Sequence, residues 1–158
     1  MVITDELFAA YLNCPTKAYL MSSTIPAERT KFGRWKTDFQ NRLRQQGVDF
    51  LRKQSRLEIK ESSPTEDFSA KGSALYIDCS IEFAELRSLI DAVEKMELRG
   101  RKTQLLPCRC QLDKRAERHE KLLLAYDALC LQGFTGVPIR VGKLVDGVSK
   151  RAKENSTK

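Results

Sequence analysis

The segment between Ala74 and Gly147 carries the pattern that most restricts what this chain can fold into. Three short apolar runs are followed by one long amphipathic stretch and then by a further apolar run. Apolar residues recur at every second position of the first run, as in a half-buried strand: Leu75, Ile77, Cys79 and Ile81. The predicted strands cover residues 74–83, 89–93, 105–110 and 137–145. A helix over 112–132, capped by Gly133, is expected before the last strand. This order of elements predicts an α/β domain.

The N-terminal region predicts two short helices. Thr4 is the expected N-cap of a first helix that runs to Leu12, because acidic residues follow it in the first turn. Pro15 is expected to end this helix and to start a short second one that reaches Met21.

A longer helix is predicted over 27–53. Its apolar residues recur at spacings that place them on one face: Phe32, Trp35, Phe39, Leu43 and Phe50. Gly47 is a point at which this helix could kink or end. The segment 61–72 is rich in turn-forming residues and is an expected loop. We therefore interpret residues 1–147 as one domain, with helices in 1–54 and a sheet core in 74–147, and residues 148–158 as a flexible basic tail.

The composition is that of a globular protein with a basic surface. The formal net charge is +7 and the pI is near 9.3, which favours polyanionic partners. Ten Lys or Arg residues against three acidic ones lie between Arg29 and Lys60; a solvated helix face is the alternative interpretation of this run. No apolar run approaches the roughly 18 residues of a membrane span, and the N-terminus lacks the features of a secretory signal. We predict a cytoplasmic protein that does not enter membranes.

The five cysteines follow no metal-binding spacing. No CxxC pairs occur, and His119 is the single histidine. The odd count argues against a disulfide framework, so we expect free and mostly buried thiols. Cys14 is expected to pack under the first helix.

Two stretches carry a resemblance to a known family. The string FAAYLNCPTKAYL at 8–20 resembles the opening of RecB-type nucleases, including the CRISPR-adaptation exonucleases. LIDAVEKM at 89–96 resembles the strand that bears their first metal-binding aspartate, and the segment from Ala125 to Gly147 resembles their closing helix and strand. The chain is thus similar to the RecB-like branch of the PD-(D/E)XK nuclease superfamily. The resemblance implies a restriction-endonuclease-like core of order α-β-β-β-α-β, with an N-terminal helical segment.

In that family the cysteine of the opening motif is often one of four iron–sulfur ligands, and three more lie near the C-terminus. Cys14 matches the first of these ligands. No cysteine follows Cys130, so the closing trio is missing and the sequence disfavours a cluster.

The resemblance implies a metal-dependent nuclease site whose motifs are eroded here. Asp91 corresponds to the aspartate that binds Mg²⁺ or Mn²⁺, and Tyr126 to the tyrosine of the QxxxY helix motif. A second acid and a lysine are expected on the third strand, but the sequence has Pro107-Cys108-Arg109. Arg109 keeps the charge of the lysine and would contact the scissile phosphate, whereas Pro107 cannot bind a metal.

Leu122 stands in place of the motif's glutamine. Three other acids are candidates for a migrated ligand: Glu82, Glu94 and Asp113. If the protein is an enzyme, the resemblance implies a Mg- or Mn-dependent DNA nuclease. The alternative interpretation of Asp91 is that it is an ordinary strand aspartate.

Basic residues along the predicted helices and loops are candidates for phosphate contacts. The candidates are Lys17, Arg34, Lys36, Arg101, Lys102, Lys114, Arg118 and Lys121. Acidic residues interleave near the last of these, so part of that face could form internal helix pairs. The modest aromatic content, 8% of the chain, gives no strong case for stacking on single strands.

We therefore predict a DNA-binding protein with a nuclease fold and a degenerate or rebuilt metal site, acting in DNA processing, defence or mobile-element biology. One alternative is a noncatalytic accessory subunit that binds a protein partner within a nucleic-acid-processing complex. Another is a basic protein unrelated to nucleases.

Overall fold

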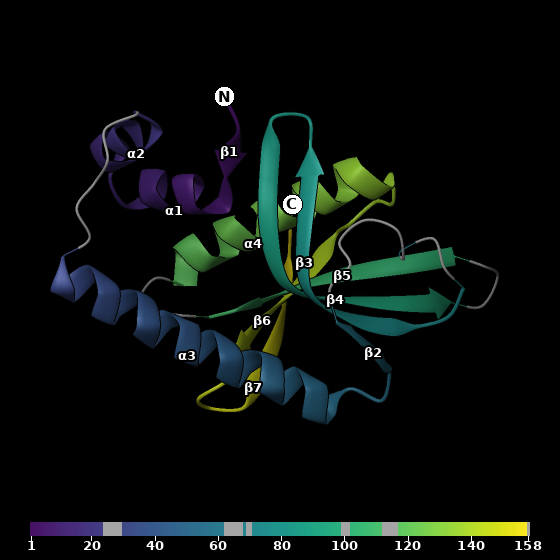
Figure 1. Ribbon diagram of the computed structural model, residues 1–158. Helices are drawn as coiled ribbons and strands as arrows, with labels where there is room; N and C mark the ends of the chain where they lie inside the picture. Colours follow the sequence, from purple (N-terminus) through teal and green to yellow (C-terminus); the bar gives the residue numbers. More distant parts are fainter. Residues whose placement is uncertain (24–29, 62–67, 69–70, 99–101, 112–116, 158) are drawn as a thin grey trace.

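The protein is an α/β structure built around one mixed sheet (Figure 1). The computed structural model describes residues 1–23, 30–61, 68, 71–98, 102–111 and 117–157. Its helices are α1 (Asp5–Asn13), α2 (Pro15–Ser22), α3 (Lys31–Gln54) and α4 (Glu117–Thr135). Its strands are β1 (Ile3–Thr4), β2 (Glu58–Glu61), β3 (Ala74–Phe83), β4 (Leu86–Leu98), β5 (Lys102–Cys110), β6 (Val141–Asp146) and β7 (Arg151–Ser156).

The sheet has the strand order β2-β3-β4-β5-β6-β7, and β1 pairs with the start of β4. The central strands β3, β4 and β5 are antiparallel to one another, whereas β2 runs parallel to β3 and β6 runs parallel to β5. The connection from β5 to β6 contains α4, because parallel neighbours need a crossover. The predicted α/β class is confirmed.

Two helical layers cover the sheet, and each closes a hydrophobic core. On one face, α4 packs over β3 to β6 and α1 packs against α4; its core includes Ile81, Ile90 and Leu131. On the other face lies α3, which in Figure 1 runs diagonally below the sheet, and its core includes Leu51, Ile77 and Val145. The sheet is therefore buried on both sides along its centre.

The residues at the starts of α1, α2 and α3 explain where these three helices begin. The Thr4 hydroxyl accepts a hydrogen bond from the Leu7 amide at 3.1 Å, which confirms the predicted N-cap of α1. Pro15 opens α2, as expected for a residue that lacks an amide proton. Thr30 caps α3 through the Gly33 amide. The predicted start of this helix, at 27, lies outside the described residues, as does most of the predicted loop 61–72.

Two glycines act differently from the prediction. α4 continues through Gly133, where a Cβ would lie 2.2 Å from the Phe83 ring, so this glycine permits a close contact rather than capping the helix. Gly136 adopts the left-handed conformation (φ +70°) after the helix ends. α3 neither kinks nor ends at Gly47, where a Cβ would lie 2.5 Å from the Cys110 sulfur; the glycine lets α3 lie close to β5.

The predicted single face of β3 is wrong. Leu75 and Ile77 lie in the core beneath α3, whereas Cys79 and Ile81 lie in the core beneath α4. The reversal occurs at Asp78, whose φ of 56° is left-handed and interrupts the regular alternation of side chains. Side chains on both faces of this strand are consequently buried, some in one core and some in the other.

The C-terminal segment also differs from the prediction. Where a flexible tail over 148–158 is expected, Arg151–Ser156 form β7 and pair antiparallel with β6. The side chains of β7 are mostly exposed, so the segment shows no apolar alternation that would reveal a strand. The segment is held as a strand by its backbone pairing with β6 at the edge of the sheet. The last strand of the core, β6, begins at Val141 rather than at 137.

Candidate functional site

Asp91 lies on β4 and is held by two internal partners. Its residue surface is 8% exposed. One carboxylate oxygen, Oδ1, accepts a hydrogen bond from Nε of Arg44 on α3, and Oδ2 accepts one from the Cys110 amide at 2.6 Å. The carboxylate therefore connects three elements, namely β4, β5 and α3.

Arg44 bridges Asp91 to a second carboxylate. Its Nη2 binds Oδ1 of Asp78, the residue with the left-handed conformation on β3. Burial lowers the pKa of Arg44, but Asp91 and Asp78 outweigh this effect, so the pKa is raised overall. The guanidinium thus occupies the space between two acidic side chains on adjacent strands.

Arg109 lies on β5 among three acidic side chains of the opposite helical layer. Its Nη1 donates to both oxygens of Asp127, at 3.2 and 3.0 Å. Its Nε lies 3.6 Å from Glu120 Oε2, and its Nη2 lies 3.9 Å from Asp5 Oδ2. Burial lowers the pKa of Arg109, but the surrounding acids, with Asp127 first, raise it overall. Arg109 therefore stays charged while only 12% of its side chain is exposed.

Asp127 is the most deeply buried acid of this group. It has no exposed surface, and it accepts a further hydrogen bond from the Ser88 hydroxyl at 2.6 Å. Burial raises the pKa of Asp127 to about 6, against the lowering effect of Arg109 and Ser88. Burial also raises the pKa of Asp5. These acids need the Arg109 charge close by, because an unpaired buried carboxylate is costly.

Tyr126 has a structural position between the N-terminus and the sheet. Its hydroxyl oxygen lies 2.6 Å from the Ile3 carbonyl oxygen and 3.2 Å from that of Arg87. Its ring stacks on Phe8 at a centroid distance of 5.1 Å. Burial raises the pKa of Tyr126 well above its usual value. This side chain joins β1 and α1 to β4.

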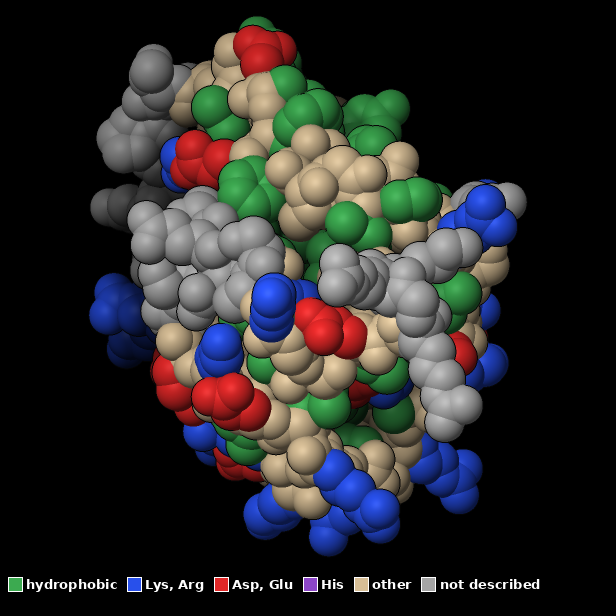
Figure 2. Space-filling view, turned by 90° about the vertical axis from the view of Figure 1, so that its right-hand side faces the viewer, with side chains coloured by type: hydrophobic (Ala, Val, Ile, Leu, Met, Phe, Trp, Pro, Cys, Tyr) green, Lys and Arg blue, Asp and Glu red, His purple; other side chains and the backbone are tan. Residues whose placement is uncertain are grey.

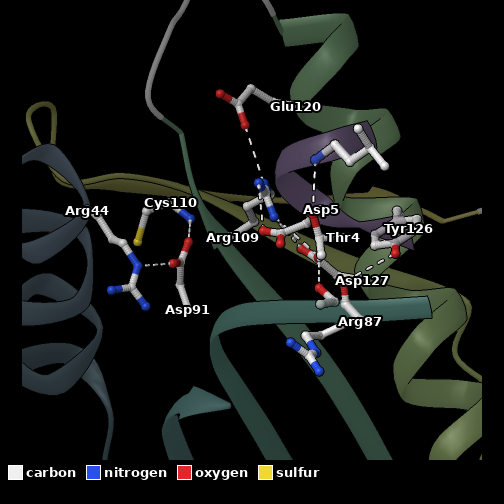
Figure 3. Close-up of polar contacts among 12 residues, drawn as sticks. Thr4, Asp5, Arg44, Arg87, Asp91, Arg109, Cys110, Glu120, Tyr126 and Asp127 are labelled. Carbon is white, nitrogen blue, oxygen red and sulfur yellow. Dashed lines mark hydrogen bonds and ion pairs between the residues drawn. The ribbon is translucent and has the colours of Figure 1, made fainter. Parts of the chain in front are cut away.

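The three predicted catalytic residues make their direct contacts in two groups, although Asp91 lies close enough to Arg109 to contribute, after Asp127, to the raised pKa of Arg109. Figure 3 shows two groups, with Asp91, Arg44 and Cys110 beside α3, and Arg109, Asp5, Glu120, Asp127 and Tyr126 near α1 and α4. Pro107, at the position of the expected second acid, is fully buried and pairs with Val93 of β4. Adjacent strands therefore direct Asp91 and Arg109 to partners on different helices.

The other candidate acids are engaged elsewhere or lie outside the description. Glu94 forms an ion pair with Lys143 of β6 at 2.7 Å, and Glu82 forms one with Arg87 at 2.6 Å. Asp113 lies outside the described residues. Within the described part of the chain, no three His, Cys, Asp or Glu side chains are grouped so that they could hold a metal ion.

The cysteines match the prediction except at Cys14. Cys79, Cys108, Cys110 and Cys130 are buried free thiols. Burial raises the pKa of Cys79 to about 12. Cys14, expected beneath the first helix, is exposed at the junction of α1 and α2, because the chain turns there before Pro15.

The predicted phosphate-contacting residues lie on three helices. Lys17 on α2, Arg34 and Lys36 on α3, and Arg118 and Lys121 on α4 are all exposed. Lys121 pairs with Glu117 at 2.9 Å, which is the internal helix pair anticipated for part of that face. Arg101 and Lys114 lie outside the described residues, as does the side chain of Lys102.

The sequence-based interpretation missed Arg44 and Asp127. Arg44 lies 47 positions from Asp91, and nothing in its surroundings marks it among the many basic residues of α3. Asp127 could have been noticed, because it interrupts the apolar run LLLAYDALCL, where a charged residue on a buried helix face needs a partner.

Comparisons with protein-family models and with curated proteins found no match to this chain.

Proposed function

We propose that this chain is a nucleic-acid-binding protein with a RecB-like nuclease core, in which internal ion pairs have replaced the catalytic site. The order α3, β3, β4, β5, α4, β6, with three antiparallel strands and a fourth parallel to the third, supports this core. Asp91 and Arg109 also lie on the second and third of these strands, as the resemblance requires.

The contacts of the Asp91 carboxylate support the proposed loss of catalysis. Both oxygens of the Asp91 carboxylate already accept hydrogen bonds, and one of them binds the Arg44 guanidinium. A divalent metal ion at Asp91 would have to displace the Arg44 guanidinium. Pro107 has no side-chain oxygen that could bind such an ion. The residues present do not suit Mg²⁺ or Mn²⁺, and Arg109 is too buried to reach a phosphate.

The exposed surface retains the positive charge that polyanions need. On the face shown in Figure 2, Lys and Arg side chains gather along the lower margin, with Asp and Glu side chains among them. Lys17, Arg34 and Lys36 are exposed on α2 and α3. Side chains of this kind neutralise phosphates without reading sequence.

The proposal predicts a binding reaction that depends steeply on salt. The affinity for labelled DNA, measured by fluorescence anisotropy, should fall by about 100-fold or more between about 50 and 200 mM NaCl. Lys36→Ala should weaken binding and lower the slope of log affinity against log salt by about one. Lys153→Ala is the matched control, because Lys153 already lies 3.5 Å from Glu117 and should change neither quantity by much. Affinity that does not respond to salt would refute a phosphate-based interaction.

A noncatalytic subunit that binds a protein partner is the second candidate. The observation that favours it is the apolar surface of α2, where Tyr19, Leu20 and Met21 are 71%, 54% and 47% exposed. Neighbouring exposed apolar side chains often mark an interface. Stoichiometric co-purification of another protein, lost in Tyr19→Ala, would support this role.

None of the described helices combines the length and hydropathy needed to cross a bilayer.

A further inference from the structure

The first half of α3 exposes three aromatic side chains, whereas its second half packs against the sheet. From Gly47 onward the helix packs against the sheet through Val48 and Leu51. Before that point, Phe32, Trp35 and Phe39 are 70%, 55% and 43% exposed. We call these three residues the aromatic stripe. At about 100° per residue the stripe lies on the side of the helix that carries Phe50, which is partly buried against this core, and more than about 100° from the side that carries Val48 and Leu51.

The three rings form one continuous stack. Phe32 and Trp35 have ring centroids 5.9 Å apart, and Trp35 and Phe39 have centroids 5.6 Å apart with nearly parallel planes, at 8°. Seven residues of helix separate the ends of the stripe, which is a rise of about 10 Å. The stack is about as long as two or three successive stacked bases.

Basic side chains flank the aromatic stripe on both sides. At about 100° per residue, Lys36 falls on one side of it, and Lys31 and Arg42 fall on the other. Within the described residues, no ion pair engages Lys31, Lys36 or Arg42. The first turn of α3 contains no acidic residue that would offset the positive end of the helix dipole. Charge complementarity thus favours a polyanion over an apolar protein surface as the occupant.

We infer that the aromatic stripe binds single-stranded nucleic acid, with bases stacked on Phe32, Trp35 and Phe39 and phosphates on the flanking Lys and Arg side chains. This inference rests on the proposed function and specifies its ligand. In a duplex the bases are paired and stacked on one another, so their faces are not open to the stripe. The site should therefore prefer single strands, DNA or RNA, over duplexes.

Trp35 supplies a direct readout, because it is the one tryptophan of the chain. Titration with an oligothymidylate or oligouridylate of about 12 nucleotides should quench its emission as a base stacks on the indole. The two oligonucleotides distinguish DNA from RNA as the source of the single strand. A duplex of equal length should bind with much less quenching.

Alanine variants test the role of the rings separately from that of the charges. By anisotropy with a labelled oligonucleotide, Trp35→Ala should weaken single-strand binding about tenfold, and the triple alanine variant of the stripe about 100-fold or more. Duplex affinity should change by less than about threefold, because the flanking charges remain. Tyr19→Ala is the matched control, since Tyr19 is equally exposed on another helix and should have no effect. Unchanged thermal unfolding would show that the variants fold.

The outcomes separate failure of this inference from failure of the proposed function. Salt-dependent binding with unchanged Trp35 emission, and with the triple variant binding as the wild type does, would overturn the inference and leave the function standing. Absence of binding by the wild type at low salt would overturn both. Emission that shifts with protein concentration alone would assign the stripe to contact between copies of this chain and would also overturn the inference.

Discussion

Replacement of Arg109 by methionine is expected to lower the free energy of unfolding by about 3–5 kcal/mol. Methionine preserves much of the side-chain volume, so the loss comes mainly from the charge. Without the guanidinium, the fully buried Asp127 loses its two hydrogen bonds of 3.2 and 3.0 Å and its nearby cation. Asp5 and Glu120 lose their cation in the same step. Urea unfolding measures the change.

The pH dependence distinguishes this cause from a simple packing defect. Burial already raises the pKa of Asp127 to about 6, and removal of Arg109 should raise it further. An acid whose pKa is raised in the folded state contributes less stability as pH rises, because the unfolded chain releases its proton first. The deficit of Arg109→Met should therefore be smaller near pH 5 than near pH 8.

Two controls make the result specific. Adding Asp127→Asn to Arg109→Met removes the buried charge while keeping an acceptor for Ser88, and should recover a large part of the lost stability. Arg87→Met removes an exposed ion pair with Glu82 on the neighbouring strand and should cost no more than about 1 kcal/mol. A deficit that neither varies with pH nor responds to Asp127→Asn would contradict the role assigned to Arg109.

Replacement of Arg44 by methionine should give the second largest loss, about 2–3 kcal/mol. The variant leaves Asp91 and Asp78 on adjacent strands without the cation that binds both. The loss should be smaller than for Arg109, because Asp78 and Arg44 are partly exposed and water can compensate. Urea unfolding again provides the measurement.

A double-mutant cycle with Asp91→Asn isolates this interaction. The two single changes should cost more in sum than the double variant, because either one alone breaks the same ion pair. Arg52→Met is the matched control, since Arg52 lies on the same helix and pairs with the exposed Glu61 at 2.6 Å. Strict additivity of Arg44→Met and Asp91→Asn would show that the ion pair adds no stability.

Local chemistry made much of the fold predictable. The Thr4 cap, the Pro15 restart and the strand over 74–83 each depend on residues close together in sequence, and the structure has them at those positions. The side-chain directions in β3 were not predictable in the same way. They depend on the left-handed conformation of Asp78, whose carboxylate binds Arg44 from a distant helix.

For the candidate site, the sequence predicted the strands on which Asp91 and Arg109 lie but not the residues that they contact. The resemblance placed Asp91 and Arg109 on neighbouring strands, which the structure has. It could not give their partners, because those come from α3 on one face and from α1 and α4 on the other. The aromatic stripe followed the helical period of a core face, but periodicity alone does not tell how far along a helix the core extends.

The most direct test of the account is an assay that measures DNA binding and DNA cleavage on the same samples. Labelled single-stranded and duplex DNA would be incubated with Mg²⁺ or Mn²⁺ and with the wild type or Asp91→Asn. The account predicts salt-sensitive binding and no cleavage by either protein, because Arg44 already occupies the Asp91 carboxylate. Metal-dependent cleavage by the wild type that Asp91→Asn abolishes would contradict it, and would mean that the Arg44 ion pair opens to admit a catalytic metal.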